Sequence, residues 1–175
     1  FQVAIWHYAQ GLAALRQQRL EDAKQHHAAL LAAREDARIE SLLMWGRYSL
    51  MHSVQVAERV LAGELAAAQG DAEIAIAALR EATNLEDAIP YDEPPGWHAP
   101  VRHTLGAVLL EAGRADEAEA VYREELRRNP ENGWSLRGLA TSLEALQRQE
   151  EAAEVHARLA QAWANADFEL TASRL

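Results

Sequence analysis

The side chains in this sequence best suited to metal binding or proton transfer are its seven histidines. His98 and His103 stand five residues apart and would face different ways on one helix, although a loop could bring His98 round. His26 and His27 are adjacent, so they point in different directions and cannot chelate one ion. No His-x3-His or Glu-x2-His pair occurs. We therefore expect no metal site and no cofactor.

Covalent catalysis has no recognisable pattern either. The sequence offers no Ser-His-Asp order, no Gly-rich phosphate loop and no nucleophile elbow. The pairs Glu124-Glu125 and Glu150-Glu151 are typical of solvated helix faces. We predict no catalytic residue. One alternative stays open, an enzyme or metal-binding protein whose site is completed by residues upstream of Phe1, with His98 or His103 contributing from this half.

Composition narrows the choice of partners. The chain has 175 residues, of which 49% are hydrophobic, enough to bury a core as one domain or one continuous array. Its 27 acidic and 17 basic residues give a net charge of −10, which argues against nucleic acid because phosphate binding needs clustered cations. Neither a membrane-spanning run nor a signal peptide is present, so no membrane contact is expected. The compartment stays open, with the cytoplasm slightly favoured.

The elements that must position any site follow a repeated pattern of small residues. Gly11, Gly63, Gly106 and Ala140 each precede an alanine by twelve residues: Ala23, Ala75, Ala118 and Ala152. Such pairs suit a close crossing of two helices, since larger side chains would hold the helices apart. Sixteen residues after each of the four come His27, Leu79, Tyr122 and His156, at sites that would pack on the next unit. We interpret His27 and His156 as packing residues with one hydrogen bond each.

Turn positions repeat with the same spacing. Seven residues after the small residues stand Gln18, Gly70, Gly113 and Gln147, and glycine there suits a helix C-cap with positive φ. Ten residues after them stand Glu21, Glu73, Asp116 and Glu150, where an acidic side chain in the first turn of a second helix complements the helix dipole. The pattern predicts helix pairs near residues 4–34, 50–84, 99–127 and 133–163.

This pattern resembles the tetratricopeptide repeat (TPR), whose standard length of 34 residues separates Gly106 from Ala140. The stretch from Tyr91 to Pro130 carries the likeness best, with Arg102-x2-Leu105-Gly106-x2-Leu109, Ala118-x3-Tyr122 and the closing proline. From about Ala62 to Thr171 the chain looks like the C-terminal part of a family of bacterial TPR proteins of poorly defined function. The resemblance implies an all-α fold, a right-handed α-solenoid of about four TPR hairpins with further repeats upstream.

The resemblance sets the expected domain organisation as a single array. Repeats are expected near 4–37, 56–89, 99–132 and 133–166, with a C-terminal tail at 167–175 that either docks on the last helix or is loose. Two insertions interrupt the array, near 38–55 and 90–98. The first is apolar and is expected to extend the flanking helices. The second is a Pro-rich loop, and Pro100 just after it suits the first turn of a helix.

The concave groove of such a solenoid is lined by the first helix of each repeat, which suggests a site for a peptide or partner protein. We expect the ligand-binding residues to be Tyr8, Glu64, Trp97, His98, His103, Trp134 and Arg137. Trp97 could pack between repeats or form a platform for ligand, and we favour packing. With Trp97 as anchor, we expect His98, His103 and Arg137 to surround one polar pocket in which Arg137 pairs with an anion.

The N-terminus is unusually apolar for the end of a repeat array. Phe1, Val3, Ile5, Trp6 and Tyr8 fall within the first eight residues, whereas a terminal repeat should show a polar outer face. Exposed apolar patches of this size seek partners. We therefore predict self-association through this N-terminal face.

Overall fold

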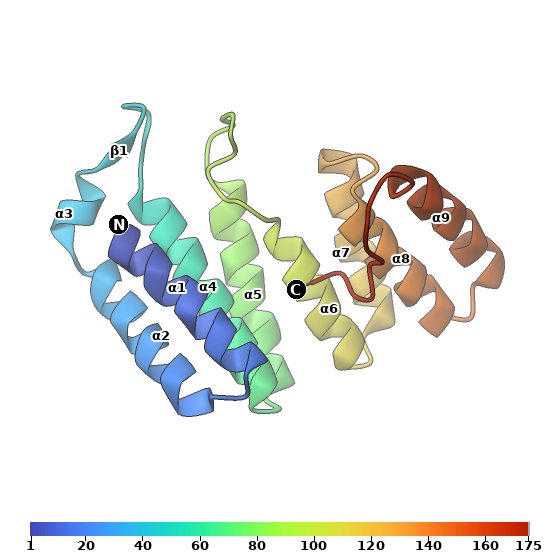
Figure 1. Ribbon diagram of the computed structural model, residues 1–175, viewed down its shortest axis with the longest axis horizontal. Coiled ribbons are helices and arrows are strands. Elements are labelled where there is room, and N and C mark those ends of the chain that lie inside the picture. The colour runs from blue at the N-terminus through green and yellow to red at the C-terminus, as the bar shows by residue number, and fades with distance from the viewer. Residues whose placement is uncertain (175) are drawn as a thin grey trace. The chain divides into compact units, whose positions relative to one another are not determined.

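The computed structural model describes residues 1–174 and is mostly helical, as the sequence predicts, with nine helices and two short strands within that range. The chain divides into two compact units, and the boundary in the sequence lies between Val101 and Arg102. The first unit holds α1 (Gln2–Arg16), α2 (Leu20–Arg34), α3 (Ala37–Glu40), β1 (Leu43–Met44), β2 (Tyr48–Ser49), α4 (Met51–Ala68) and α5 (Ala72–Asp87). The second holds α6 (Val101–Glu111, apart from its first residue), α7 (Ala115–Arg128), α8 (Gly133–Ala145) and α9 (Gln149–Ala162) (Figure 1).

Residues with positive φ end the first helix of each successive pair. The φ angles are 58° at Gln18, 85° at Gly70, 75° at Gly113 and 61° at Gln147, so all four predicted turn positions adopt the left-handed conformation. Glycine adopts it without steric cost, whereas the two glutamines have a Cβ that disfavours it. The predicted acidic residues follow in the first turns of α2, α5, α7 and α9.

Small residues allow the helices within each unit to approach closely. Ala23, Ala75 and Ala118 are fully buried and Ala152 is 2% exposed. A Cβ added to Gly63 would lie 2.6 Å from the Leu79 side chain, and one added to Gly106 would lie 2.3 Å from the Tyr122 ring. Because real Cβ contacts are longer than this, the large residue of one helix occupies the space that the glycine of the other leaves free.

The first insertion differs from the prediction. Instead of extending the neighbouring helices, residues 37–50 form α3 and a β-hairpin in which β1 pairs antiparallel with β2, and only the stretch from Met51 onward belongs to α4. The hairpin turns at Trp45 and Gly46, whose φ angles are 50° and 73°. A helix cannot continue through two such residues, so their backbone conformation explains the difference.

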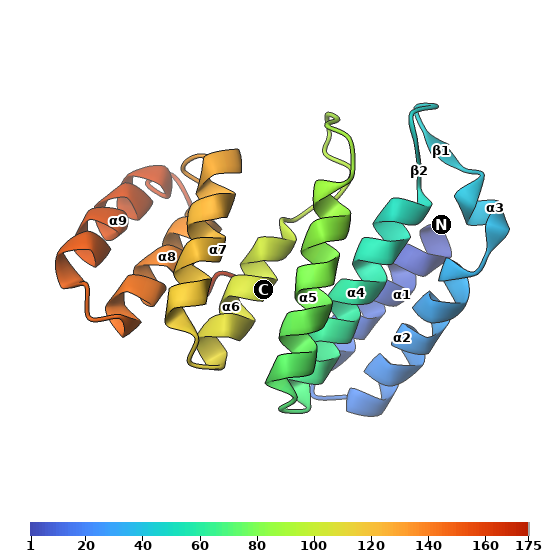
Figure 2. The ribbon, with the colours of Figure 1, turned by 180° about the vertical axis from the view of Figure 1, so that it is seen from behind.

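The Pro-rich loop that follows α5 lies against this hairpin, and Figure 2 shows both projecting beyond the ends of the helices of the first unit. Arg47 pairs with Asp92 at 3.4 Å. The Ser53 hydroxyl of α4 donates a hydrogen bond to the Gly96 carbonyl at 3.0 Å. The two insertions, far apart in sequence, thus support each other.

A buried charge cluster ties α2 to α4. Glu58 is fully buried, and its carboxylate binds His27 Nε2 at 2.8 Å, Arg34 Nη1 at 2.6 Å and the guanidinium of Arg59. Burial alone would raise the pKa of Glu58, but the hydrogen bonds from His27, Arg59 and Arg34 outweigh it and lower the pKa to about 2. Glu58 is therefore charged and paired, and His27 serves packing with one hydrogen bond.

Candidate functional site

Three of the predicted ligand-binding residues come together in the first unit. The Tyr8 ring of α1 lies 5.3 Å from the Trp97 ring and 6.0 Å from the His98 ring, measured between centroids. Tyr8 and Trp97 are each 7% exposed, whereas His98 is on the surface. Trp97 thus anchors the Pro-rich loop on a first helix.

Glu64 of α4 adds a charge beside this aromatic cluster. It is 4% exposed and pairs with Arg16 of α1 at 3.2 Å. Burial, together with the negative charge of Glu64, raises the pKa of Tyr8 above its usual value. The phenol of Tyr8 therefore stays protonated and can act only as a neutral hydrogen-bonding group.

In the second unit, His103 is held by the start of α8. Its Nε2 lies 3.0 Å from the Ser135 hydroxyl, and Asn132 caps α8 by accepting from the Ser135 N–H at 3.1 Å. His103 is 7% exposed, and this burial lowers its pKa to about 4, although a side-chain hydrogen bond with Asn132 acts to raise it. At neutral pH the imidazole is uncharged.

Arg137 and Trp134 lie on α8. The Arg137 Nε is buried and has no hydrogen-bond partner among residues 1–174. A buried donor without a partner costs free energy. Trp134 is half-buried and meets the Trp163 ring edge-on at 6.3 Å. The predicted polar pocket joins Trp97 and His98 of the first unit to His103 and Arg137 of the second, and it stays a prediction.

The C-terminal tail forms contacts that the sequence did not reveal. After α9 the chain turns back past α8 and α7 and reaches α6 (Figure 1). Leu170 and Ser173 are buried, and the Ser173 hydroxyl contacts both the Tyr122 hydroxyl and the His103 carbonyl oxygen. Arg174 pairs with Glu111. No periodicity marks these residues, so only their tertiary contacts identify them.

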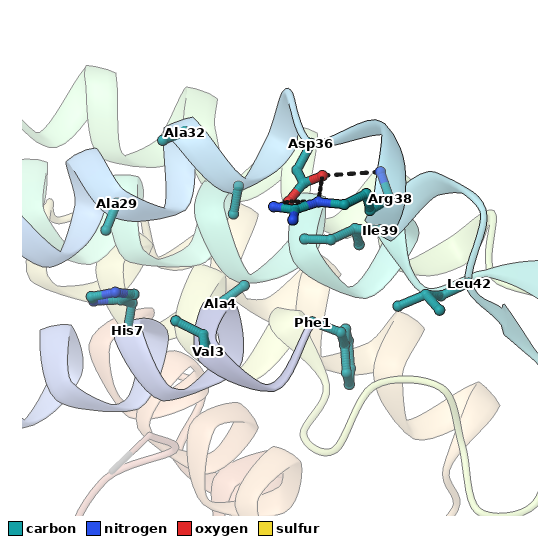
Figure 3. A pocket seen from close by; sticks show the side chains of 11 residues that line it. Phe1, Val3, Ala4, His7, Ala29, Ala32, Asp36, Arg38, Ile39 and Leu42 are labelled. Carbon is teal, nitrogen blue, oxygen red and sulfur yellow. Dashed lines mark hydrogen bonds and ion pairs between the residues drawn. The ribbon is translucent and has the colours of Figure 1, made fainter.

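A cavity of about 510 Å³ opens beside the N-terminal half of α1 (Figure 3). Its walls come from α1, the second half of α2, and α3, and they are mostly apolar, including Ala4, Ala29 and Ile39. At its rim Asp36 accepts hydrogen bonds from Arg38. Val3, which lines the cavity, is 68% exposed, and Trp6, further along α1, is 54% exposed. Val3 and Trp6 belong to the N-terminal face, whose self-association stays a prediction.

Among residues 1–174, no three histidine, aspartate or glutamate side chains are grouped so that they could hold a metal ion. Within the same range, no helix combines the length and apolar character needed to cross a membrane.

The burial of His103 predicts a pH-dependent stability. Its pKa is about 4 in the folded state and near 6.5 when unfolded, so the unfolded chain binds more protons between these values. The contribution of neutral His103 to the free energy of unfolding is complete above pH 6.5 and is lost as the pH falls toward 4. From pH 7 to 4.5, urea unfolding should show wild type losing about 2–3 kcal/mol more than His103→Gln, which cannot take up the proton. Parallel curves would show that His103 does not titrate in this way.

Comparisons with known proteins add evidence on the fold alone. No protein-family model matches the sequence, and no curated protein does. Among solved structures, the chain is similar to a crystal structure of MamA protein, with 14% sequence identity and a TM-score of 0.52, over 96% of this chain and 97% of that chain. This likeness supports a TPR-like helical fold without pointing to a particular bacterial family.

Two structures of MamA AMB-1 are similar at 17% identity each. Their TM-scores are 0.47 and 0.49, over 90% and 94% of this chain and 96% and 93% of those chains.

Proposed function

We propose that this protein is an interaction module, a right-handed α-solenoid of about four TPR hairpins that binds an extended segment of a partner protein. The observation that carries the proposal is the succession of helices that change direction at four left-handed residues, seven positions after the small residues where helices cross. The TPR-like fold of the solved neighbour supports it. Solenoids of this kind present first helices side by side, which creates an extended binding surface.

The proposed ligand contacts lie on those first helices and on the Pro-rich loop. In the first unit they are Tyr8, Glu64, Trp97 and His98, and in the second they are His103, Trp134 and Arg137. Tyr8 and Trp97 are largely buried, so they shape the surface and leave His98 to reach a ligand. With His103 uncharged near neutral pH, Arg137 provides the positive charge of this set. The ligand is therefore expected to place a carboxylate against Arg137.

Peptide selection tests this function directly. A phage library of 12-residue peptides is panned against the whole chain, and the affinity of selected peptides is measured by fluorescence anisotropy. Arg137→Ala should weaken peptides that carry a carboxylate at least tenfold, because a charge-assisted hydrogen bond contributes roughly 1.5–3 kcal/mol. The helical circular dichroism signal should not change.

Arg127→Ala is the matched control. Arg127 is a mostly exposed arginine of α7 that lines a different cavity, of about 560 Å³, together with Arg123 and Arg158. The control should bind the selected peptides like wild type. Equal weakening by both variants would place binding in that cavity and contradict the proposal, as would the absence of any selected peptide.

A further inference from the structure

The segment that follows α9 already occupies a surface of the second unit. Its start is fixed by the Trp163 Nε1–H, which donates to the Phe168 carbonyl oxygen at 2.9 Å. Leu170 then lies against the start of α8, 9% exposed, where its side chain would come within 3.3 Å of a Cβ on Gly133. Thr171 and Ala172 are exposed, and Ser173 is 4% exposed. The space that Gly133 leaves free is filled first by the Trp163 ring, 2.3 Å from such a Cβ, and the Leu170 side chain packs beside that ring.

Ser173 satisfies a polar group that would otherwise be buried alone. The Tyr122 phenol is fully buried, and its hydroxyl makes a short contact with the Ser173 hydroxyl. Ser173 in turn donates to the His103 carbonyl oxygen at 3.2 Å. One hydroxyl can donate to the carbonyl and accept from the phenol, so a small hydroxyl residue suits this position. An aliphatic residue there would leave the buried phenol unpaired.

The next residue adds a charge contact. One guanidinium nitrogen of Arg174 lies 2.7 and 2.8 Å from the two carboxylate oxygens of Glu111. The Arg174 side chain is 15% exposed and that of Glu111 is 58% exposed. Glu111 is the last residue of α6, and the negative end of the helix dipole there favours a cation as well.

The attachment of this segment is slight compared with that of a helix. From Asp167 to Arg174 it has no helix or strand, and only Leu170 and Ser173 are buried, while Phe168 is 54% exposed. A segment with few buried contacts and no regular backbone hydrogen bonding detaches at a small fraction of the global unfolding free energy. It can therefore leave while the helices stay folded.

We propose that this surface, hereafter the tail site and formed by Gly133, Tyr122, His103 and Glu111, is a binding site for an extended segment of a partner protein with the pattern aliphatic-x-x-Ser-Arg. The chain's own residues 170–174 fill the tail site and must leave before the partner binds. The inference rests on the proposed function and specifies its partner. The side chains of the tail itself show what the site accepts, and the carboxylate of Glu111 favours a basic residue.

A peptide equal to the tail tests the proposal. The probe is residues 167–174, acetylated, amidated and labelled with fluorescein, and it is titrated into the full chain and into a chain ending at Ala166. The shortened chain should bind the probe at least tenfold more tightly than the full chain, in which the resident tail competes. A probe with Ser173→Val should bind the shortened chain at least tenfold more weakly.

Charge exchange locates the contact. In the shortened chain, Glu111→Arg should weaken the probe at least tenfold, and a probe carrying Arg174→Glu should recover most of that loss. Should the shortened chain lose its helical circular dichroism, the same titration is made with the full chain carrying Leu170→Asp and Arg174→Glu, which frees the tail without removing it. That variant should bind the unaltered probe at least tenfold more tightly than wild type.

Four results would overturn the proposal. One is a folded chain with a removed or freed tail that does not bind the probe. Another is a probe affinity that does not change with Glu111→Arg in the chain or with Arg174→Glu in the probe. The third is concentration-dependent dimerisation of the full chain in light scattering, abolished by Leu170→Asp, which would make a second copy the occupant. Peptides selected from the phage library that bind both chains equally would also contradict the tail site, but would leave the proposed function standing.

Discussion

Tyr122→Ala is expected to destabilise the second unit by about 3–5 kcal/mol, the range for removing a buried aromatic side chain. The ring is fully buried between two glycines, since a Cβ on Gly106 would lie 2.3 Å from it and one on Gly138 would lie 2.2 Å from it. Two sides of the resulting cavity are the helix backbone at Gly106 and Gly138, which cannot collapse as side chains can. Urea unfolding followed by circular dichroism, with hydrogen exchange in α6–α8, measures the loss.

Tyr122→Phe is the matched control. It keeps the ring between the two glycines and removes only the hydroxyl that contacts Ser173. The expected cost is about 1 kcal/mol, the usual net contribution of one hydrogen bond. If the alanine variant were no less stable than the phenylalanine variant, burial of the ring would not be what stabilises the packing of these helices.

Trp97→Ala is expected to cost the first unit about 3–5 kcal/mol for the same physical reason. The indole is 7% exposed and lies against the Tyr8 ring, and it is the large buried side chain of the Pro-rich loop. Losing it should both lower the free energy of unfolding and make residues 90–98 more susceptible to protease. Urea unfolding and limited proteolysis measure the two effects.

Trp45→Ala provides the comparison for Trp97. Trp45 stands at the turn of the hairpin in the same unit, and its side chain is 74% exposed. Replacing it should change the free energy of unfolding by no more than about 0.5 kcal/mol, as is usual for surface sites. Equal losses in the two variants would mean that burial of Trp97 does not hold the loop.

Local requirements explain why much of the fold could be predicted. Each of the four helix pairs has a left-handed residue at its turn and a small residue where its helices cross, at a fixed spacing. Glycine suits the turn, and glycine or alanine suits the crossing, so the pattern can be recognised in the sequence. Gln18 and Gln147 could be identified only because they repeat the spacing of Gly70 and Gly113. The helical content followed from this pattern and is confirmed.

The hairpin and the tail could not be predicted in the same way. The residues of the first insertion are as apolar as those of a helix, and what makes them a hairpin is the positive φ of Trp45 and Gly46 together with support from the Pro-rich loop. The tail was expected either to dock on the last helix or to be loose. Phe168 does dock on Trp163 at the end of α9. Ser173 goes further and reaches Tyr122 of α7 and His103 of α6, and nothing in the sequence between them signals this contact.

The candidate site was predictable only in part. The aromatic cluster of Tyr8, Trp97 and His98 agrees with the expectation that Trp97 packs on a first helix. The hydrogen bond between His103 and Ser135 was not foreseen, because it depends on how α8 begins at Asn132. A sequence pattern predicts which face of a helix a residue lies on. The hydrogen-bond partner of that residue depends on side chains of other helices, which the pattern does not place.

The contact between Tyr8 and Trp97 has a consequence for how the first unit folds. In an ideal repeat array each repeat touches only its neighbours, so folding can begin anywhere and stop part of the way along. Here a residue of the first helix is joined to a loop that follows the fifth. Forming that contact closes most of the unit into one loop, which raises the contact order and slows folding. It also means that α1 cannot fray without releasing the loop after α5, so the first unit should unfold in one cooperative step.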